Sequence, residues 1–102
     1  MEILVRNYKS RKGEIDIVAR DGETLCFVEV KTRRRAVHST PGEAVGTAKR
    51  QRIAAAAREY LRAIGRPDVP YRFDIVEVIA PRRGTIRIDH HRSAFVAERS
   101  LA

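Results

Sequence analysis

The sequence predicts a single α/β domain over residues 1–102, built on a mixed β-sheet with one central crossover helix. Three stretches typical of strands lie within residues 3–32, apolar residues recur at helical spacing over 47–64, and strand-like alternation returns over 71–79. A chain of 102 residues has the usual length of one domain. Because the helix falls between the third and fourth strands, we expect these two strands to pair in parallel within an otherwise antiparallel sheet.

The first half of the chain is predicted to form three strands. ILVRNY (3–8) has the composition of a short strand, and GEIDIVAR (13–20) alternates in a strand-like way. Asp21-Gly22 is a hairpin turn signal, so a third strand is expected over 24–32.

The second half is predicted to hold the helix and the remaining strands. Residues 33–46 show no clear period and are expected to form a loop. Thr47 has the character of a helix N-cap, and Gly65 is a credible terminator just past the helix. The remaining expected elements are a strand over 71–79, a strand near 85–89 and a short helix from about 93 to 101.

The composition limits the partners and the compartment. The chain holds 21 Lys and Arg against 13 Asp and Glu, and 17 of the basic residues are arginines. This excess predicts a polyanionic partner, nucleic acid before an anionic membrane surface. Cys26 is the only cysteine, which excludes an intrachain disulfide and a multi-thiolate metal site. The chain shows no signal-peptide core and no apolar run near the ~20 residues of a membrane span, so a cytoplasmic protein is expected.

Charged residues interrupt two of the predicted strands on one face. Glu29 and Lys31 point the same way from the third strand, and Glu14 and Asp16 share a face of the second. With a two-residue turn at Asp21-Gly22, residue i faces residue 43 − i, so Glu14 is expected across from Glu29, and Asp16 diagonal to Glu29. The three carboxylates and Lys31 are therefore expected to converge.

Such a cluster favours a divalent cation. Two carboxylates about 4 Å apart repel each other by about 4 kcal/mol at an effective dielectric near 20. Oxygen ligands of this kind suit Mg²⁺ or Mn²⁺, which can polarise a phosphodiester and acidify a bound water, while Lys31 stabilises the developing negative charge. The simpler interpretation of Glu29 and Lys31 alone is an exposed ion pair worth under about 1 kcal/mol.

At this point the chain resembles a known family. The segments RNY, GEIDIVARDG, LCFVEVKTRRR, PGEAV, KRQRIAAAAREYL and RFDIVEV are similar to those of the YraN-type bacterial proteins. These proteins belong to the PD-(D/E)xK nuclease superfamily, have a restriction-endonuclease-like fold and are related to Holliday-junction resolvases. The resemblance implies that Asp16, Glu29 and Lys31 are catalytic, and that Asp16 and Glu29 bind Mg²⁺ with the Val30 carbonyl and, as a fourth member, Glu14.

The resemblance departs from the family at its start. Family members typically carry a helix with a Gly-Glu pair before the RNY segment, whereas Met1 lies only a few residues before it here. Sheet surface left uncovered by that helix would favour a homodimer.

Two basic groups are expected to bind the phosphate backbone. They are the run that follows the third strand and the start of the helix, namely Arg33, Arg34, Arg35, Lys49, Arg50 and Arg52. About five phosphate contacts on duplex DNA would give a log–log salt slope near −4.5. The arginines carry no base-reading pattern, so structure-selective or non-specific binding is expected.

Three functions remain open from the sequence. The first is a Mg²⁺-dependent nuclease acting on DNA. The second is a non-catalytic nucleic-acid-binding module of the same fold, and the third is an interaction protein that uses the uncovered sheet. Divalent-ion stabilisation lost in Asp16→Ala separates the first from the second, and the third predicts no salt-dependent DNA binding.

Overall fold

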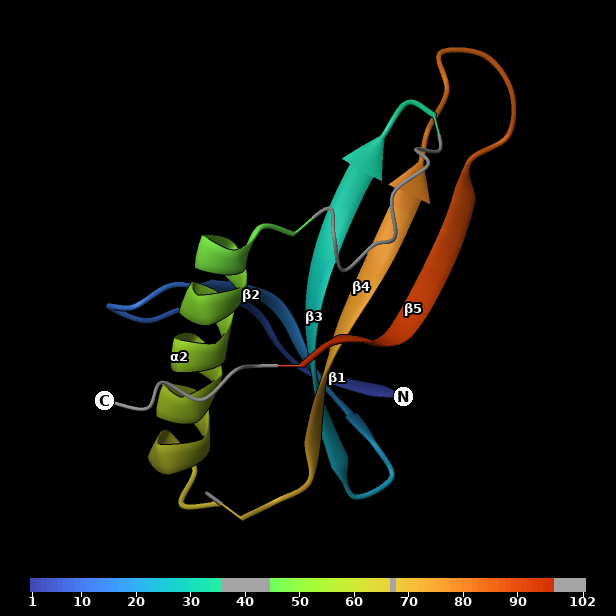
Figure 1. The fold of residues 1–102 in the computed structure, drawn as a ribbon. Helices are drawn as coiled ribbons and strands as arrows, with labels where there is room; N and C mark the ends of the chain where they lie inside the picture. Colours follow the sequence, from blue (N-terminus) through green and yellow to red (C-terminus); the bar gives the residue numbers. More distant parts are fainter. Residues whose placement is uncertain (36–44, 67, 97–102) are drawn as a thin grey trace.

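The computed structural model describes residues 1–35, 45–66 and 68–96, and shows a five-stranded sheet with one helix against it (Figure 1). The elements in chain order are β1 (Glu2–Lys9), β2 (Glu14–Asp21), β3 (Thr24–Arg33), α2 (Thr47–Ala63), β4 (Tyr71–Ile79) and β5 (Arg87–Phe95). Neighbours in the sheet follow the order β1-β2-β3-β4-β5. β3 and β4 are parallel and the other pairs are antiparallel, as predicted. The architecture agrees with the restriction-endonuclease-like fold that the resemblance implied.

The core lies between α2 and one face of the sheet. Ile53, Ala57 and Leu61 recur on the buried side of the helix, and they pack in one cluster with Phe27 and Ile75 of the central strands. Alanines make up much of this helical face, and small side chains let the helix approach the sheet closely. Among the described residues, no helix is long and apolar enough to cross a membrane.

The two ends of α2 differ in how well the sequence predicted them. The N-cap is Gly46 and it makes no side-chain cap, so the prediction of Thr47 as the N-cap is wrong. Thr47 lies in the first turn, where its hydroxyl accepts a weak hydrogen bond from Arg50 at 3.4 Å. Gly65 terminates the helix as predicted, with φ +68, and its N–H and that of Arg66 close a Schellman motif.

The β2–β3 hairpin has a different register from the predicted one. Asp21 pairs with Thr24, so the two turn residues are Gly22 and Glu23 and the paired residues sum to 45 instead of 43. Gly22 has φ +61, and a hairpin turn of the type that needs a positive φ at its first position takes glycine there. Continued along both strands, this register brings Asp16 level with Glu29, closer than the diagonal placement expected.

β5 is longer than predicted. It runs to Phe95, so the expected helix is wrong for residues 93–95, and residues 97–101 of that prediction lie outside the described part. Pairing with β4 shifts between Phe73 and Ile75, where β5 holds extra residues. Ser93 has φ 50 at this bulge, and Phe95 then stacks on Phe73 with ring centroids 5.0 Å apart.

The face of the sheet away from α2 carries a smaller apolar cluster. Ala19, Cys26 and Val28 are buried there. The pKa of the Cys26 thiol is raised, mainly because burial disfavours the thiolate. Cys26 is therefore a small buried residue with a free thiol.

Candidate active site

An open hollow of about 260 Å³ lies where β2 and β3 meet the start of α2. Three acidic residues line it together with residues of the β1–β2 turn and the helix; the full set is Gly13, Glu14, Asp16, Glu29, Lys49, Arg52 and Ile53. The hollow therefore collects the three carboxylates that the sequence predicted to converge. A larger hollow of about 440 Å³ near Ile64 has a single carboxylate in its lining, that of Glu23, which makes it a poorer candidate.

Asp16 lies where the pairing of β2 with β3 ends. The last paired residues are Ile17 and Val28, and the Asp16 carboxylate then accepts the Val30 N–H at 2.8 Å in place of a backbone carbonyl. Ile15 and Val18 belong to one core cluster, although residues three apart point to opposite faces of a regular strand. β2 is therefore irregular at this point, and the irregularity turns the Asp16 side chain towards the end of β3.

The same irregularity is present in the neighbouring strand. The register of β1 with β2 places Asn7 opposite Asp16. Asn7 has φ 54, a left-handed conformation that asparagine tolerates better than most residues. Both strands thus depart from regular strand geometry beside the hollow.

Glu29 is a buried carboxylate on the floor of the hollow. Its side chain is 6% exposed, and its Oε1 lies 2.5 Å from the Lys49 ammonium on the first turn of α2. A buried charge needs a partner, and Lys49 supplies it. Sequence reasoning had assigned Lys49 to the phosphate backbone, whereas the structure places it inside the site.

Lys31 does not line the hollow. It follows Glu29 on the same face of β3, is half-buried, and lies beside Glu77 of the parallel strand β4. Glu77 has two further basic neighbours, Arg33 at 3.4 Å and His91 at 2.9 Å, although neither contact has hydrogen-bond geometry. Lys31 therefore lies next to Glu29 along β3 and beside β4, outside the hollow.

The β1–β2 turn is held against α2 by close packing. A Cβ added at Gly13 would lie 2.8 Å from the Arg52 carbonyl oxygen, a distance that real Cβ atoms essentially never show. Gly13 and Arg52 both line the hollow. The absence of a side chain at Gly13 thus lets the β1–β2 turn contact α2 beside the site, which sequence reasoning missed.

The residues expected to bind phosphate separate into two places. Arg52 is exposed at the hollow, and Arg50 beside it is half-buried. Arg34 and Arg35 are exposed just past the carboxyl end of β3, and Arg33 forms an ion pair with Glu77. The six residues thus do not form one continuous surface.

The donor set fits Mg²⁺. The part of the chain that the structure describes holds no preformed group of three or more His, Cys, Asp and Glu residues suited to a metal. Mg²⁺ usually needs only one or two carboxylates, because it keeps several waters and takes further oxygens from substrate phosphates. Asp16 and Glu29 supply those two, and Glu14 lies exposed at the rim.

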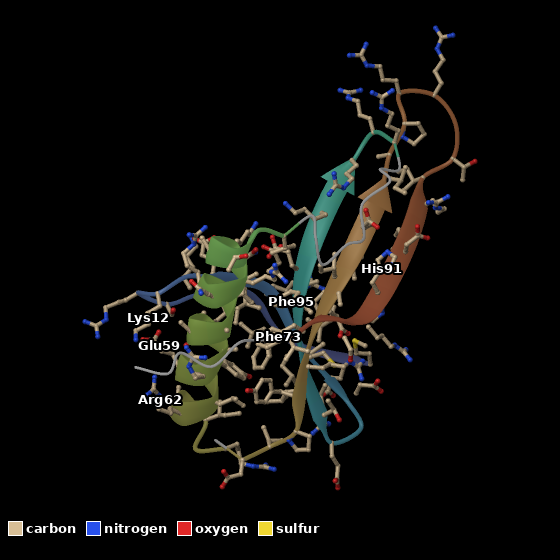
Figure 2. All side chains as sticks on the ribbon, in the orientation of Figure 1. Lys12, Glu59, Arg62, Phe73, His91 and Phe95 are labelled. Carbon is tan, nitrogen blue, oxygen red and sulfur yellow. The ribbon has the colours of Figure 1, made fainter. Side chains whose placement is uncertain are left out.

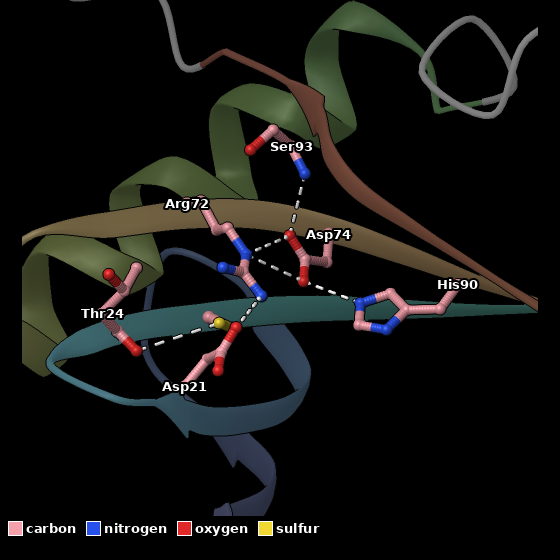
Figure 3. Close-up of polar contacts among 7 residues, drawn as sticks. Asp21, Thr24, Arg72, Asp74, His90 and Ser93 are labelled. Atoms are coloured by element: carbon pink, nitrogen blue, oxygen red, sulfur yellow. Dashed lines mark hydrogen bonds and ion pairs between the residues drawn. The ribbon is translucent and has the colours of Figure 1, made fainter. Parts of the chain in front are cut away.

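A second polar cluster was not predicted and lies on the face of the sheet away from α2 (Figure 3). Asp74 is fully buried and accepts hydrogen bonds from Arg72, His90 and the Ser93 N–H. Arg72 also reaches Asp21 in the β2–β3 turn, at 3.0 Å. The available signal was an aspartate inside RFDIVEV, where strand-forming residues surround a charge.

The fold and the hollow define the class as an α/β, restriction-endonuclease-like protein with acidic residues at the end of a hairpin. The comparisons then give the family. The model described as "Uncharacterised protein family UPF0102" matches residues 1–78, so the chain belongs to that family. This confirms the resemblance to the YraN-type proteins and their nuclease-like superfamily.

Relatives of this family cover most of the chain. A UPF0102 protein of Symbiobacterium thermophilum is 48% identical over 95 residues, which are 93% of this chain and 80% of the relative. One from Parafrankia sp. is 46% identical over 94 residues, covering 92% and 80%. One from Geobacter sulfurreducens is 46% identical over 93 residues, covering 91% and 73%. The names of these relatives state no activity.

Proposed function

We propose that the protein is a metal-dependent nuclease that hydrolyses phosphodiester bonds in DNA. The observation that supports this most directly is the pair Asp16 and Glu29, which line one hollow, with Lys31 next to Glu29 on the same strand face. Burial of the Glu29 carboxylate, which is 6% exposed, is costly, and a functional role accounts for that cost.

The chain's own residues have separate tasks in this proposal. The Val30 N–H fixes the Asp16 carboxylate at 2.8 Å, and burial fixes Glu29, so both oxygen donors are preorganised. A bound Mg²⁺ would supply charge neutralisation at the phosphodiester and a water of lowered pKa. Lys31 stabilises the negative charge that develops on the phosphate, and the exposed Arg52 holds the backbone at the rim.

One observation favours a second function, a non-catalytic nucleic-acid-binding module. The Lys49 ammonium already neutralises Glu29. Because Lys49 already neutralises the Glu29 charge, the protein could keep its fold and its basic surface without a bound cation. The two functions differ in whether Mg²⁺ displaces Lys49 from Glu29.

Cleavage of a labelled panel tests the proposal. Linear duplex, single strand, flap and four-way junction are incubated with Mg²⁺ or Mn²⁺, using the wild-type protein, Lys31→Ala and the control Lys12→Ala, which removes an exposed lysine from the β1–β2 turn. We expect metal-dependent cutting that falls at least about 100-fold in Lys31→Ala and persists in the control. Binding without cutting by all three proteins would overturn the proposal and favour the binding module.

A further inference from the structure

Four arginines from two separate segments meet at the end of the sheet that lies farthest from the helix. The parallel pairing of β3 with β4 brings their carboxyl ends together, with Arg33 opposite Ile79 and the Ala80 N–H donating to the Arg33 carbonyl at 2.7 Å. The chain then leaves β3 through two arginines and leaves β4 through two more. We call this set the arginine tip: Arg34, Arg35, Arg82 and Arg83.

The arginine tip is not neutralised by the acidic residues that the structure describes. All four residues are exposed, and no carboxylate of the described segments lies within ion-pair distance of them. The flanking arginines differ, because Arg33 pairs with Glu77 and Arg87 pairs with Asp89 at 3.0 Å. Figure 2 shows several side chains that end in nitrogen atoms projecting from the end of β3 and from the β4–β5 loop.

Four adjacent positive charges repel one another, so the tip lowers the stability of the free protein unless an anionic partner binds it. Gly84, with φ +109, lets the β4–β5 loop turn directly after Arg83, and Arg82 and Arg83 are both exposed. Guanidinium groups suit forked contacts with phosphate oxygens. Without amide or aromatic side chains among its members, the tip fits a sugar–phosphate backbone better than base edges.

The distance between the hollow and the arginine tip indicates how a DNA duplex would lie on the protein. Arg34 lies five residue steps beyond Glu29, just past the end of β3, which corresponds to about 16 Å at ~3.3 Å per residue. Stacked base pairs rise by about 3.4 Å, so this span matches about five base pairs of a duplex laid along the strand. We propose that the arginine tip binds the phosphate backbone of duplex DNA about five base pairs from the bond that is cut. This inference rests on the proposed nuclease function.

Salt-dependent binding tests the arginine tip without any cutting. Fluorescence anisotropy with a labelled 20-base-pair duplex in EDTA is measured across a salt series for wild type, for Arg82→Ala/Arg83→Ala and for the control Arg58→Ala/Arg62→Ala on α2. Loss of two phosphate contacts should reduce the log–log slope by about 1.8, and the control should leave it near the wild-type value. All substituted residues are exposed, so circular dichroism should show unchanged folding.

Other results would overturn the inference. An equal change of slope in both double variants would mean that only net charge matters. An unchanged slope in the tip variant, with binding to phosphatidylserine vesicles lost instead, would assign the tip to a membrane surface. Because these measurements use EDTA, they stay valid if the cleavage panel fails, so failures of the two proposals can be told apart.

The distance along the duplex between the arginine tip and the cut can be measured directly. The native thiol of Cys26 is buried, so a cysteine introduced by Arg83→Cys can be labelled selectively with an iron–EDTA reagent. We expect radical cleavage of the duplex centred about five base pairs from the protein's own cut. Radical cleavage centred on that cut, or none, would contradict the placement.

Discussion

The two carboxylate oxygens of Asp16 have separate tasks. One oxygen accepts the Val30 N–H and so replaces the strand pairing that ends one residue earlier. The other is left to face the hollow, where the proposed cation would bind. Substitutions of this residue therefore affect folding and metal binding by different amounts.

We expect Asp16→Ala to lower the free energy of unfolding by about 1–3 kcal/mol, because the Val30 N–H loses its acceptor. Asp16→Asn keeps an oxygen acceptor, so its free energy of unfolding should fall much less. We expect Mg²⁺ to stabilise the wild-type protein, and both variants should lose this stabilisation. Urea unfolding with and without Mg²⁺ measures both effects, and an Asn variant that is still stabilised by Mg²⁺ would contradict the assignment of Asp16 as a ligand.

The contact between Lys49 and Glu29 predicts a competition with the cation. Lys49→Met should destabilise the protein in EDTA by about 1–2 kcal/mol, less than for a fully buried pair, because the Lys49 side chain is 42% exposed. Mg²⁺ should then raise the melting temperature of the variant more than that of the wild type. Thermal unfolding of Lys49→Met and of Lys12→Met, an exposed control, checks this, and an equal response to Mg²⁺ would argue against competition.

At the scale of elements, the bulge in β5 depends on one buried carboxylate. Asp74 accepts the Ser93 N–H at 3.0 Å, and Ser93 holds the left-handed conformation that lets β5 accommodate its extra residues. His90 and Arg72 complete the set of donors around Asp74. The position of Phe95 over Phe73 follows from this bulge.

Asp74→Ala should therefore lower the free energy of unfolding by about 3–5 kcal/mol, since it leaves the partly buried Arg72 without its main counter-charge. Asp89→Ala is the matched control, because Asp89 pairs with Arg87, an exposed residue, and should cost under about 1 kcal/mol. Urea denaturation followed by circular dichroism compares the two. Similar losses in both variants would mean that the Asp74 network contributes little.

The β2–β3 turn contributes a pH dependence. The pKa of Asp21 lies below its ordinary value of 3.8, because Arg72 donates a hydrogen bond to it and outweighs the opposing effect of burial. A lowered pKa means that the stabilisation is present above pH 3.8 and is lost as the pH falls through the lower, folded-state pKa. Asp21→Asn should thus lower the melting temperature at pH 7 and have a progressively smaller effect as the pH falls below 3.8; an effect that does not change with pH would contradict the ion pair.

Periodicity predicted the elements better than their boundaries and register. The helix, its glycine terminator and the parallel strand pair follow from apolar spacing and from chain order, and these predictions are confirmed. The hairpin register failed because Asp21-Gly22 fits two turn positions that differ by one residue. The end of β5 failed because its conformation depends on Asp74, a distant partner that no local pattern reveals.

The same reasoning explains what was predicted of the candidate site. Period-two alternation suffices to place Glu29 and Lys31 on one face of β3. The orientation of Asp16 also depends on the irregularity of β2 beside the hollow, and no local period shows that irregularity. Lys49 comes from a helix whose rotation against the sheet is decided by packing, and its contact with Glu29 could not be read from spacing.

At the scale of the whole molecule, the face of the sheet away from α2 exposes apolar residues on both edge strands, β1 and β5. Ile3 is 48% exposed and Ile88 is 66% exposed. The homodimer expected from the sequence remains a prediction, and this face is where it would form. Light scattering at micromolar concentrations should then give twice the chain mass, and Ile88→Lys should return the monomer; a monomeric wild type would contradict the prediction.

The parallel pairing of β3 with β4 has a consequence for how the chain folds. Asp16 and Glu29 lie 13 positions apart in a local hairpin, whereas Glu29 and its neighbour in β4, Ile75, are 46 positions apart. Closing the longer loop costs more conformational entropy and tends to come later. We therefore expect the two carboxylates to be close together in early, partly folded species, before the docking of α2 brings Lys49 to Glu29, so that divalent ions speed refolding by relieving a repulsion that the native state no longer has.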